Sequence, residues 1–360
     1  MLKRILPVLG LTVGVSMGAL MGPATAADQV EINFVSWGGA YTKSQVKGMI
    51  EPYQQANPHV KINVIDYTGG LAEVKAQIEA KNVTWQIVDL TPDTAIAGCD
   101  EGLFESLDPA KWAPGPNGEP ATEDFVEGAI SECFIGNIAY TTVMAYNSKK
   151  VSGTPATVAD FWDLKKFPGK RSLRNKPDVN MEWGVEAMGV SRDKIYETLS
   201  TAEGIDLAFK GLEKIKSDVV WWEAGAQPPQ LLADGEVAFA SAWNGRLYNA
   251  IVEEKQPIVI MWDTQVFDLD GFAVPKGAPN MDEVIKFLSF ATSTKPLAET
   301  TKYISYGPLR KSSMKLVSDS ILPHLPTAPE NFKNAIQLDT EWWADRTVEL
   351  NERFAAWLAK

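Results

Sequence analysis

The chain has 360 residues, of which 45% are hydrophobic and 22% are charged, and its formal net charge is −12. This length and composition are typical of a globular protein with two lobes rather than one core. The acidic balance argues against nucleic acid and anionic membrane surfaces as partners, because their negative charges repel an acidic protein.

The first 26 residues predict a secretory signal peptide. Lys3 and Arg4 precede an apolar run over 5–20, and an Ala-Thr-Ala triplet ends at Ala26. We expect cleavage after Ala26 and a periplasmic location for the mature chain. Loss of the two basic residues leaves 32 basic against 46 acidic ones, a net charge of −14. No later run approaches the roughly 18 apolar residues that a membrane helix needs.

Strands and helices alternate at the start of the mature chain. Residue patterns predict strands at 30–36, 60–67 and 85–90, and helices at 42–55, 71–81 and 94–101. This alternation predicts an α/β fold with a mostly parallel sheet covered on both faces. Ligands of such sheets bind at the carboxyl ends of the strands, where Trp37, Thr91 and Asp93 stand.

The rest of the chain predicts a second α/β unit and two crossings between the units. We interpret the apolar strand at 135–147 as one crossing and residues 267–275 as the return. Further strands are expected at 171–173, 237–242 and 258–262, and helices at 158–165, 181–188, 191–216, 282–292, 295–301 and 340–358.

Cys99 and Cys133 are the only cysteines of the sequence. In an exported chain we expect them to form a disulfide that closes a loop of about 35 residues, with free thiols as the alternative. His59 and His324 are the only histidines, and neither has a His or Cys neighbour at ligand spacing. We therefore expect no metal and no cofactor.

An aromatic stretch at 219–246 reads VVWWEAGAQPPQLLADGEVAFASAWNGR. Its three tryptophans stand near Glu223 and Arg246, among Gly, Gln and Pro rather than at helical spacing. Aromatic faces beside fixed charges suit a small molecule with an ammonium group and an apolar body. The alternative is that these tryptophans belong to the core.

Six segments carry a family resemblance: VSWGGAY, MAYNSKKV, TPATVADFWDLKKFPGKRSL, GAQPPQLLADGEVAFASAWNGR, DLDGFAVPKGAPN and YGPLRK. In this order they resemble the periplasmic solute-binding proteins of bacterial ABC importers, in the spermidine/putrescine-binding branch of extracellular solute-binding family 1. The resemblance implies two hinged α/β lobes that close on a ligand, and a monomer that delivers it to an ABC permease. Residues 27–145 with 269–316 are expected to form the first lobe, and 146–268 with 317–360 the second.

The resemblance also implies a set of ligand contacts at Trp37, Thr91, Asp93, Trp243, Asp270 and Tyr306. We expect Asp270 to pair with an ammonium group. Trp37 and Trp243 are expected to sandwich the methylene chain of the ligand. Asp268 and Glu223 are further acids expected near the cleft.

The sequence departs from the polyamine-binding pattern at 173–178, LRNKPD, where basic residues replace an acidic cluster. Arg174 and Arg246 would repel one end of a diamine but could bind a carboxylate through two parallel hydrogen bonds. We expect a putrescine-like amine rather than spermidine, with an ω-amino acid such as 4-aminobutyrate as the alternative, and a sugar or an anion as a further one. If Arg246 instead pairs with Glu223, Asp268 or another acid, the argument for a carboxylate is lost.

A secreted hydrolase that uses Asp268 and Asp270 is the competing class. We expect the two carboxylates, which are two residues apart on an extended segment, to diverge rather than converge on one bond. The sequence has no GxSxG motif and no Cys–His pair in reach, so nucleophilic catalysis has little support. We therefore expect a binding protein and not an enzyme.

Overall fold

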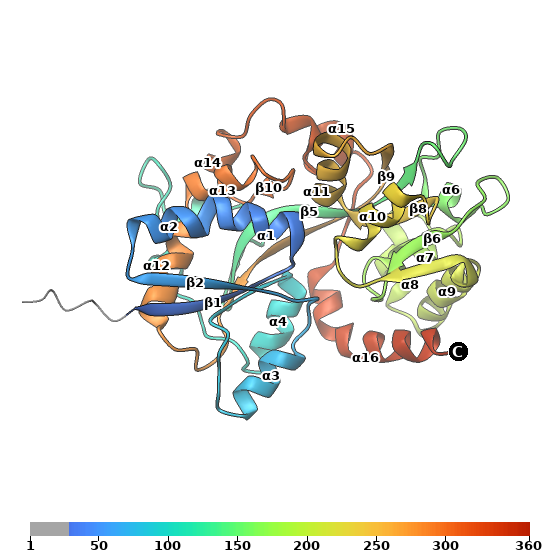
Figure 1. Ribbon diagram of the computed structural model, residues 1–360. Coiled ribbons are helices and arrows are strands. Elements are labelled where there is room, and N and C mark those ends of the chain that lie inside the picture. The colour runs from blue at the N-terminus through green and yellow to red at the C-terminus, as the bar shows by residue number, and fades with distance from the viewer. Residues whose placement is uncertain (1–28) are drawn as a thin grey trace, which may run out of the picture.

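Residues 29–360, which the computed structural model describes, form one mixed β-sheet surrounded by helices (Figure 1). The predicted signal peptide and its cleavage site lie outside the described residues. The strands are β1 (Val30–Ser36), β2 (Val60–Asp66), β3 (Ile87–Leu90), β4 (Ile130–Ser131), β5 (Phe134–Asn147), β6 (Arg171–Arg174), β7 (Val219–Trp222), β8 (Phe239–Trp243), β9 (Ile258–Ala273), β10 (Gly307–Pro308) and β11 (Ile336–Gln337).

The helices lie between these strands along the chain. They are α1 (Gly39–Gln45), α2 (Glu51–Ala56), α3 (Ala72–Glu79), α4 (Pro92–Asp100), α5 (Ala121–Asp124), α6 (Val158–Trp162), α7 (Asn180–Glu186), α8 (Ile195–Leu199), α9 (Ala202–Glu213), α10 (Gln227–Asp234), α11 (Asn244–Tyr248), α12 (Met281–Ala291), α13 (Thr294–Thr300), α14 (Lys311–Met314), α15 (Pro329–Phe332) and α16 (Thr340–Leu358). Within residues 29–360, no helix combines the length and the apolar character that crossing a membrane requires.

The main strand order of the sheet is β2-β1-β3-β9-β5-β8-β6-β7. Strand β1 pairs in parallel with β2 and β3, and β6 pairs in parallel with β7 and β8. Between these groups, β5 and β9 run antiparallel to each other. They must do so because β5 carries the chain from one group to the other and β9 brings it back. The predicted parallel sheet is therefore found in the two outer groups, and the sheet as a whole is mixed.

Two apolar cores lie on either side of the crossing strands. One contains Phe34, Phe272 and Phe287, and the other contains Trp183 and Phe239. In Figure 1 the first core belongs to the left half of the molecule, around β1, β2 and α12, and the second to the right half, around β6, β8 and α7. These halves are the two lobes, whose chain boundaries remain a prediction.

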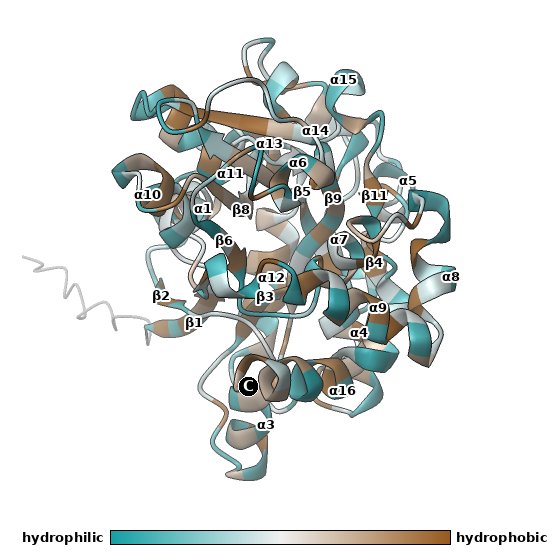
Figure 2. Cartoon of the chain, turned by 90° about the vertical axis from the view of Figure 1, so that its right-hand side faces the viewer, coloured by the Kyte–Doolittle hydropathy of each residue, from teal (hydrophilic) through white to brown (hydrophobic). Residues whose placement is uncertain are grey.

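Helix α16 joins the second core and also reaches the first lobe. It buries Trp342, Trp343, Leu350 and Phe354, and Figure 2 shows the alternating polar and apolar bands of an amphipathic helix along it. Thr347 in its middle donates from Oγ1 to Asp93 Oδ2 of α4 at 3.5 Å. The C-terminal helix therefore bridges the lobes beside the carboxyl end of β3.

Several segments differ from the sequence-based prediction, among them the helix expected at 191–216, which is divided into α8 and α9. The helix expected at 42–55 is interrupted by a π-helical turn at Val46–Ile50, where a Cβ on Gly48 would lie 2.8 Å from Thr300 Cγ2 of α13. The strand β7 was not recognised. The helix α11 was not recognised either, because Asn244 starts it directly after β8 and no turn residue separates the two elements.

The strands expected at 258–262 and 267–275 are one continuous strand, β9. The polar residues between them suggested a loop, but Thr264 and Gln265 are fully buried. Thr264 Oγ1 accepts a hydrogen bond from Met144 N at 2.8 Å, and Thr264 O accepts one from Trp183 Nε1 at 2.9 Å. Tertiary partners therefore satisfy the polar groups of Thr264, and Gln265 Nε2 donates to Pro326 O at 3.2 Å, whereas Gln265 Oε1 is buried without a partner in the described chain.

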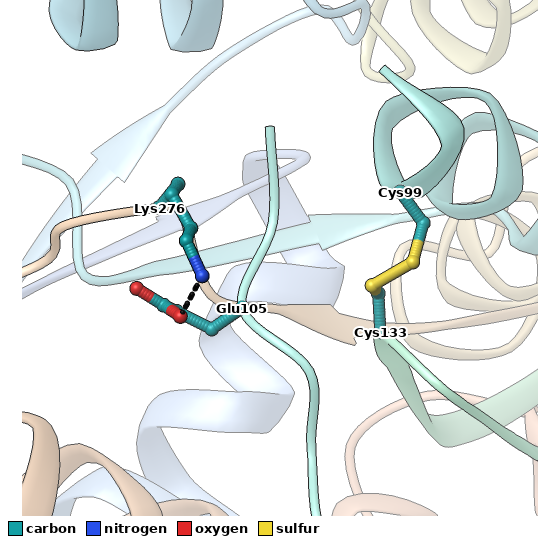
Figure 3. Close-up of a disulfide and its surroundings, with 4 residues drawn as sticks. All are labelled: Cys99, Glu105, Cys133 and Lys276. Atoms are coloured by element: carbon teal, nitrogen blue, oxygen red, sulfur yellow. Dashed lines mark hydrogen bonds and ion pairs between the residues drawn. A yellow bond between two sulfur atoms is a disulfide. The ribbon is translucent and has the colours of Figure 1, made fainter. Parts of the chain in front are cut away.

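Cys99 and Cys133 form the predicted disulfide, with Cα atoms 5.9 Å apart (Figure 3). It joins α4 to the turn before β5. Nearby, Lys276 Nζ pairs with Glu105 Oε2 at 2.7 Å, as Figure 3 also shows. Both links hold the loop after α4 against the first lobe.

Replacing both cysteines by serine, Cys99→Ser with Cys133→Ser, is expected to lower the free energy of unfolding by about 3–4 kcal/mol, because the open loop gains entropy in the unfolded chain. Urea denaturation of both proteins measures this difference. Wild-type protein treated with a reductant provides the control, since it should lose a similar amount. Equal midpoints with and without the bridge would contradict the expectation.

Candidate functional site

Two adjoining cavities lie between the lobes at the carboxyl ends of β1, β3 and β6, with volumes of about 70 Å³ and 20 Å³. We call them the larger and the smaller chamber. Trp37 after β1, Thr91 after β3, Tyr140 of β5 and Arg174 of β6 line both chambers. The strand ends that the sequence marked as candidates therefore meet at one site.

The larger chamber holds buried carboxylates without a cationic partner. Asp268 of β9 is 4% exposed and accepts hydrogen bonds from Leu269 N at 2.8 Å and Tyr140 Oη at 3.3 Å. Burial raises the pKa of Asp268 well above its usual range, and the carboxylate of Asp93 raises it further. No Lys, Arg or His of the described chain pairs with either acid. A cationic group of a ligand would supply the missing partner.

Arg174 stands between the two chambers and is already paired. Its Nη1 donates to Asp178 Oδ2 at 2.9 Å. The guanidinium carbon lies 5.1 Å from the ring centroid of Trp243 and 5.8 Å from that of Trp37, within cation–π range. The one acid that remained in the basic segment 173–178 is therefore used inside the protein.

Arg246, at the edge of the smaller chamber, has no acidic partner among residues 29–360. Its Nη1 donates to Tyr306 Oη at 2.9 Å, and its Nη2 donates to the carbonyl oxygens of Trp37 at 3.0 Å and Gly38 at 3.2 Å. Its Nε is buried without a hydrogen-bond partner. The alternative in which Arg246 pairs with Glu223 or Asp268 is not what the structure contains, so a full positive charge faces the chamber.

These contacts of Arg246 also cross the gap between the lobes. Arg246 belongs to α11 of the second lobe, whereas Trp37 and Gly38 follow β1 of the first. The arginine is 5% exposed and stacks on Trp243, whose ring centroid is 4.4 Å from the guanidinium carbon. It therefore holds the two lobes together at the point where a ligand would sit.

Asp270 lines the smaller chamber but has a second carboxylate beside it. Tyr41 Oη lies 3.1 Å from Asp270 Oδ1 and 3.3 Å from Asp89 Oδ1. Burial raises the pKa of Asp89 to about 6, and burial together with the charge of Asp89 raises the pKa of Asp270 well above its usual range. Unlike the isolated ammonium partner expected from the sequence, Asp270 therefore has a second carboxyl group beside it that opposes its ionisation.

The tryptophans do not form the expected sandwich. The ring centroids of Trp37 and Trp243 are 5.8 Å apart with an angle of 69° between the ring planes, so one edge meets the other face. Trp222 packs on Trp243 in the same way at 5.2 Å. Trp221 belongs to the second core, against Phe354. The indoles therefore form one wall beside Arg174 and Arg246 rather than two parallel plates.

Glu223 lies apart from the other candidates. It is exposed and accepts a hydrogen bond from Asn175 Nδ2 at 3.0 Å. It lines a separate opening of about 380 Å³ that shares Arg174 and Lys176 with the larger chamber. Glu223 can therefore meet a solute outside the two chambers but not one held inside them.

The carboxylates of Asp268 and Asp270 lie on the same face of β9, so their expected divergence is wrong. Residues two apart on a strand share a face. Asp268 faces the larger chamber, Asp270 faces the smaller one, and the charge of Asp268 contributes to the raised pKa of Asp270.

Sequence analysis missed Asp89, Tyr41 and Tyr140. Asp89 is the only acid in the apolar strand IVDL and is fully buried, which is a signal that could have been used. Nothing in the local pattern marks the two tyrosines, because only the packing of α1 and β5 brings them to the site. No group of His, Cys, Asp and Glu in the described chain could hold a metal ion.

The comparisons with known proteins agree with this geometry. Residues 48–327 match the family model of bacterial extracellular solute-binding proteins. The chain is 37% identical over 343 residues, 95% of each chain, to the gamma-aminobutyric acid-binding protein of Pseudomonas aeruginosa. It is 23% identical over 251 residues, 68% of each chain, to the spermidine/putrescine-binding periplasmic protein of Escherichia coli K12.

Solved structures give the same result. The PBP MotA from A. tumefaciens B6 in complex with glucopine superposes with a TM-score of 0.85 at 29% identity, covering 91% of this chain and 100% of that one. A GABA receptor superposes with a TM-score of 0.78 at 32% identity, covering 92% and 98%. The chain therefore belongs to the bacterial extracellular solute-binding protein family. It is the solute-binding component of an ABC importer.

A buried glutamate supports the floor of the larger chamber. Glu182 of α7 is fully buried, and its Oε1 accepts hydrogen bonds from Trp343 Nε1 at 2.7 Å and Tyr196 Oη at 2.8 Å. Trp343 lines the larger chamber. Burial raises the pKa of Glu182 to about 7.

Because its folded-state pKa is raised, Glu182 contributes full stability below its unfolded pKa of about 4.5, and this contribution is lost as the pH rises through about 7. We expect Glu182→Gln to be more stable than wild type by on the order of 2 kcal/mol at pH 8.5, and about equally stable at pH 4.5. Urea denaturation at the two pH values measures this. A difference that does not change with pH would contradict the expectation.

Proposed function

We propose that the protein binds a short ω-amino acid, represented by 4-aminobutyrate, between its lobes and delivers it to a membrane permease without turnover. One observation carries the proposal: a guanidinium without an acidic partner, Arg246, and carboxylates without a cationic partner, Asp93 and Asp268, line adjoining chambers. A ligand with a charge of opposite sign at each end satisfies both. The mature chain, starting after Ala26, acts as a periplasmic monomer.

The charges give the ligand a direction. Its ammonium group lies in the larger chamber, where Asp268 and Asp93 gain the cation that they lack and Asp268 becomes ionised. Its carboxylate lies in the smaller chamber beside Arg246, with Arg174 between the chambers as the second positive charge. The methylene chain crosses the indole wall of Trp37 and Trp243.

The size of the cavity supports a short ligand. A cavity needs roughly 10–15 Å³ to hold one water-sized group, which corresponds to one non-hydrogen atom of a ligand. The two chambers, of about 70 Å³ and 20 Å³, therefore hold a ligand of about six to nine non-hydrogen atoms. This range matches 4-aminobutyrate or putrescine, whereas spermidine and hexose sugars are larger. The volume of the two chambers therefore does not support the alternative of a sugar or a polyamine longer than putrescine.

Charge then distinguishes the two short candidates. Putrescine was the main sequence-based expectation, but its second ammonium group would lie beside Arg246, whose guanidinium has no compensating acid in the described chain. The greater identity to the gamma-aminobutyric acid-binding protein than to the spermidine/putrescine-binding one also supports the amino acid. The proposal therefore takes the zwitterion over the diamine.

Calorimetric titration of the mature protein with 4-aminobutyrate, putrescine, n-butylamine and butyrate tests the proposal. We expect 4-aminobutyrate to bind at least about tenfold tighter than any of the others, because a lost hydrogen bond between charged groups costs about 1.5–3 kcal/mol. Tighter binding of putrescine would refute the assignment of a carboxylate end.

Two variants test the direction of the ligand. Arg246→Gln should reduce the affinity ratio of 4-aminobutyrate to n-butylamine about tenfold or more, because only the amino acid has a carboxylate to lose. Asp268→Asn should reduce the ratio of 4-aminobutyrate to butyrate in the same way. Each ratio cancels the effect that a variant has on lobe closure.

The exposed Asp319 provides a matched control for the two variants. Asp319→Asn changes one surface charge at a residue that lines neither chamber. It should leave both affinity ratios unchanged. The opposite result is that Arg246→Gln lowers the ratio of 4-aminobutyrate to butyrate and Asp268→Asn lowers the ratio of 4-aminobutyrate to n-butylamine. It would show that the ligand binds in the reverse direction.

A further inference from the structure

The hydrogen bonds around Tyr41 leave one proton to be explained. Tyr41 Oη accepts from Asn137 Nδ2 at 2.8 Å, and it lies 3.1 Å from Asp270 Oδ1 and 3.3 Å from Asp89 Oδ1. A phenol has a single proton, so it can donate to only one of these two carboxyl oxygens. If both carboxyl groups were ionised, the other oxygen would face a lone pair and a neighbouring negative charge.

The charge of Arg246 favours ionisation of Asp89, but within residues 29–360 no Lys, Arg or His forms an ion pair with either carboxyl group. The amide of Gln45 donates from Nε2 to Asp89 Oδ2, and Ser36 Oγ, which donates to Gln45 Oε1 at 2.5 Å, fixes that amide orientation. Arg246 is directed to Tyr306 and to two backbone carbonyl oxygens instead. The titratable and charged groups around the two carboxyl groups are Tyr41, Tyr67, Asp268, Tyr140, Arg174, Arg246 and Tyr306.

The sheet brings the two carboxyl groups together. Strand β3 pairs antiparallel with β9 so that Asp89 is opposite Phe272. Asp270 is two residues before Phe272 on β9 and therefore on the same face, as a diagonal neighbour of Asp89. Both side chains are almost fully buried, at 0% and 4% exposure. Two buried carboxylates in such a position hold one proton between them rather than ionising separately.

We infer that Asp89 and Asp270 share one proton, and that Asp89 thereby keeps Asp270 neutral so that the smaller chamber accepts the carboxylate end of a ligand. The specificity part of this inference rests on the proposed function, whereas the shared proton does not. Asp89 lines neither chamber and acts as a positioning residue through Asp270. The raised pKa of each group agrees with the geometry.

The shared proton decides which end of a solute the smaller chamber accepts. A neutral Asp270 leaves Arg246 as the net charge of that chamber, which favours an anion. An ionised Asp270 would offset the charge of Arg246 and remove this preference for an anion. Asp270, which the resemblance to polyamine-binding proteins marked as an ammonium partner, thus contributes no negative charge, because it shares a proton with Asp89.

Asp89→Asn tests the inference, because the amide removes the repelling charge and can donate to Asp270, which then ionises. We expect the affinity ratio of 4-aminobutyrate to putrescine, measured by calorimetry at pH 7.5, to fall at least tenfold in this variant. Asp319→Asn is the surface control and should keep the wild-type ratio. An unchanged ratio in Asp89→Asn would overturn the specificity role.

An infrared measurement tests the shared proton without any ligand. At pH 7.5 the wild-type protein should show the carbonyl band of a protonated carboxylic acid that is absent from both Asp270→Asn and Asp89→Asn. Asp319→Asn is the control, since it removes an exposed carboxylate and should leave this band in place. Absence of the band from the wild type would overturn the inference.

The two measurements separate the possible failures. If the wild type binds no 4-aminobutyrate, the proposed function fails, and the infrared band alone decides whether the proton is shared. If Asp89→Asn does not fold, the comparison of wild type with Asp270→Asn still shows whether Asp270 carries a proton. In liganded wild type the Asp270 band should persist, while any band of Asp268 disappears as that group meets the ammonium.

Discussion

The separation of unpaired charges across one small cavity is the constraint on which this site depends. Arg246 is buried against neutral hydrogen-bond acceptors, and Asp268 is buried against donors that carry no charge. Burying a charge without a partner is unfavourable, so each group is left with a deficit that only a ligand with opposite charges can remove.

The long strands β5 and β9 make this arrangement possible. They carry the chain between the lobes and place Tyr140, Asp268 and Asp270 at the middle of the crossing. The guanidinium of Arg246 reaches from the second lobe to the backbone after β1 in the first. The contact between the lobes and the wall of the smaller chamber therefore share one side chain.

The two neighbouring acids of β9 show how environment divides identical side chains into different roles. Asp268 faces a chamber whose Arg174 pairs with Asp178, and no cation of the described chain pairs with Asp268 itself, whereas Asp270 has Asp89 and the hydroxyl of Tyr41 beside it. Desolvation raises the pKa of both, but the nearest charged neighbour differs. From residue type alone, Asp268 and Asp270 would both be expected to bind the ammonium group of a ligand.

The sequence by itself determined the α/β architecture, the crossing strands, the family and the disulfide, because these depend on local periodicity and on patterns that lie within short segments of the chain. It also marked Trp37, Asp93, Trp243 and Arg246, which line the two chambers. Only the tertiary structure decided which charges remain unpaired, since Arg174 meets Asp178, and Asp270 meets Asp89 from a strand 181 residues away. Protonation and pairing depend on distances between segments that no local pattern contains.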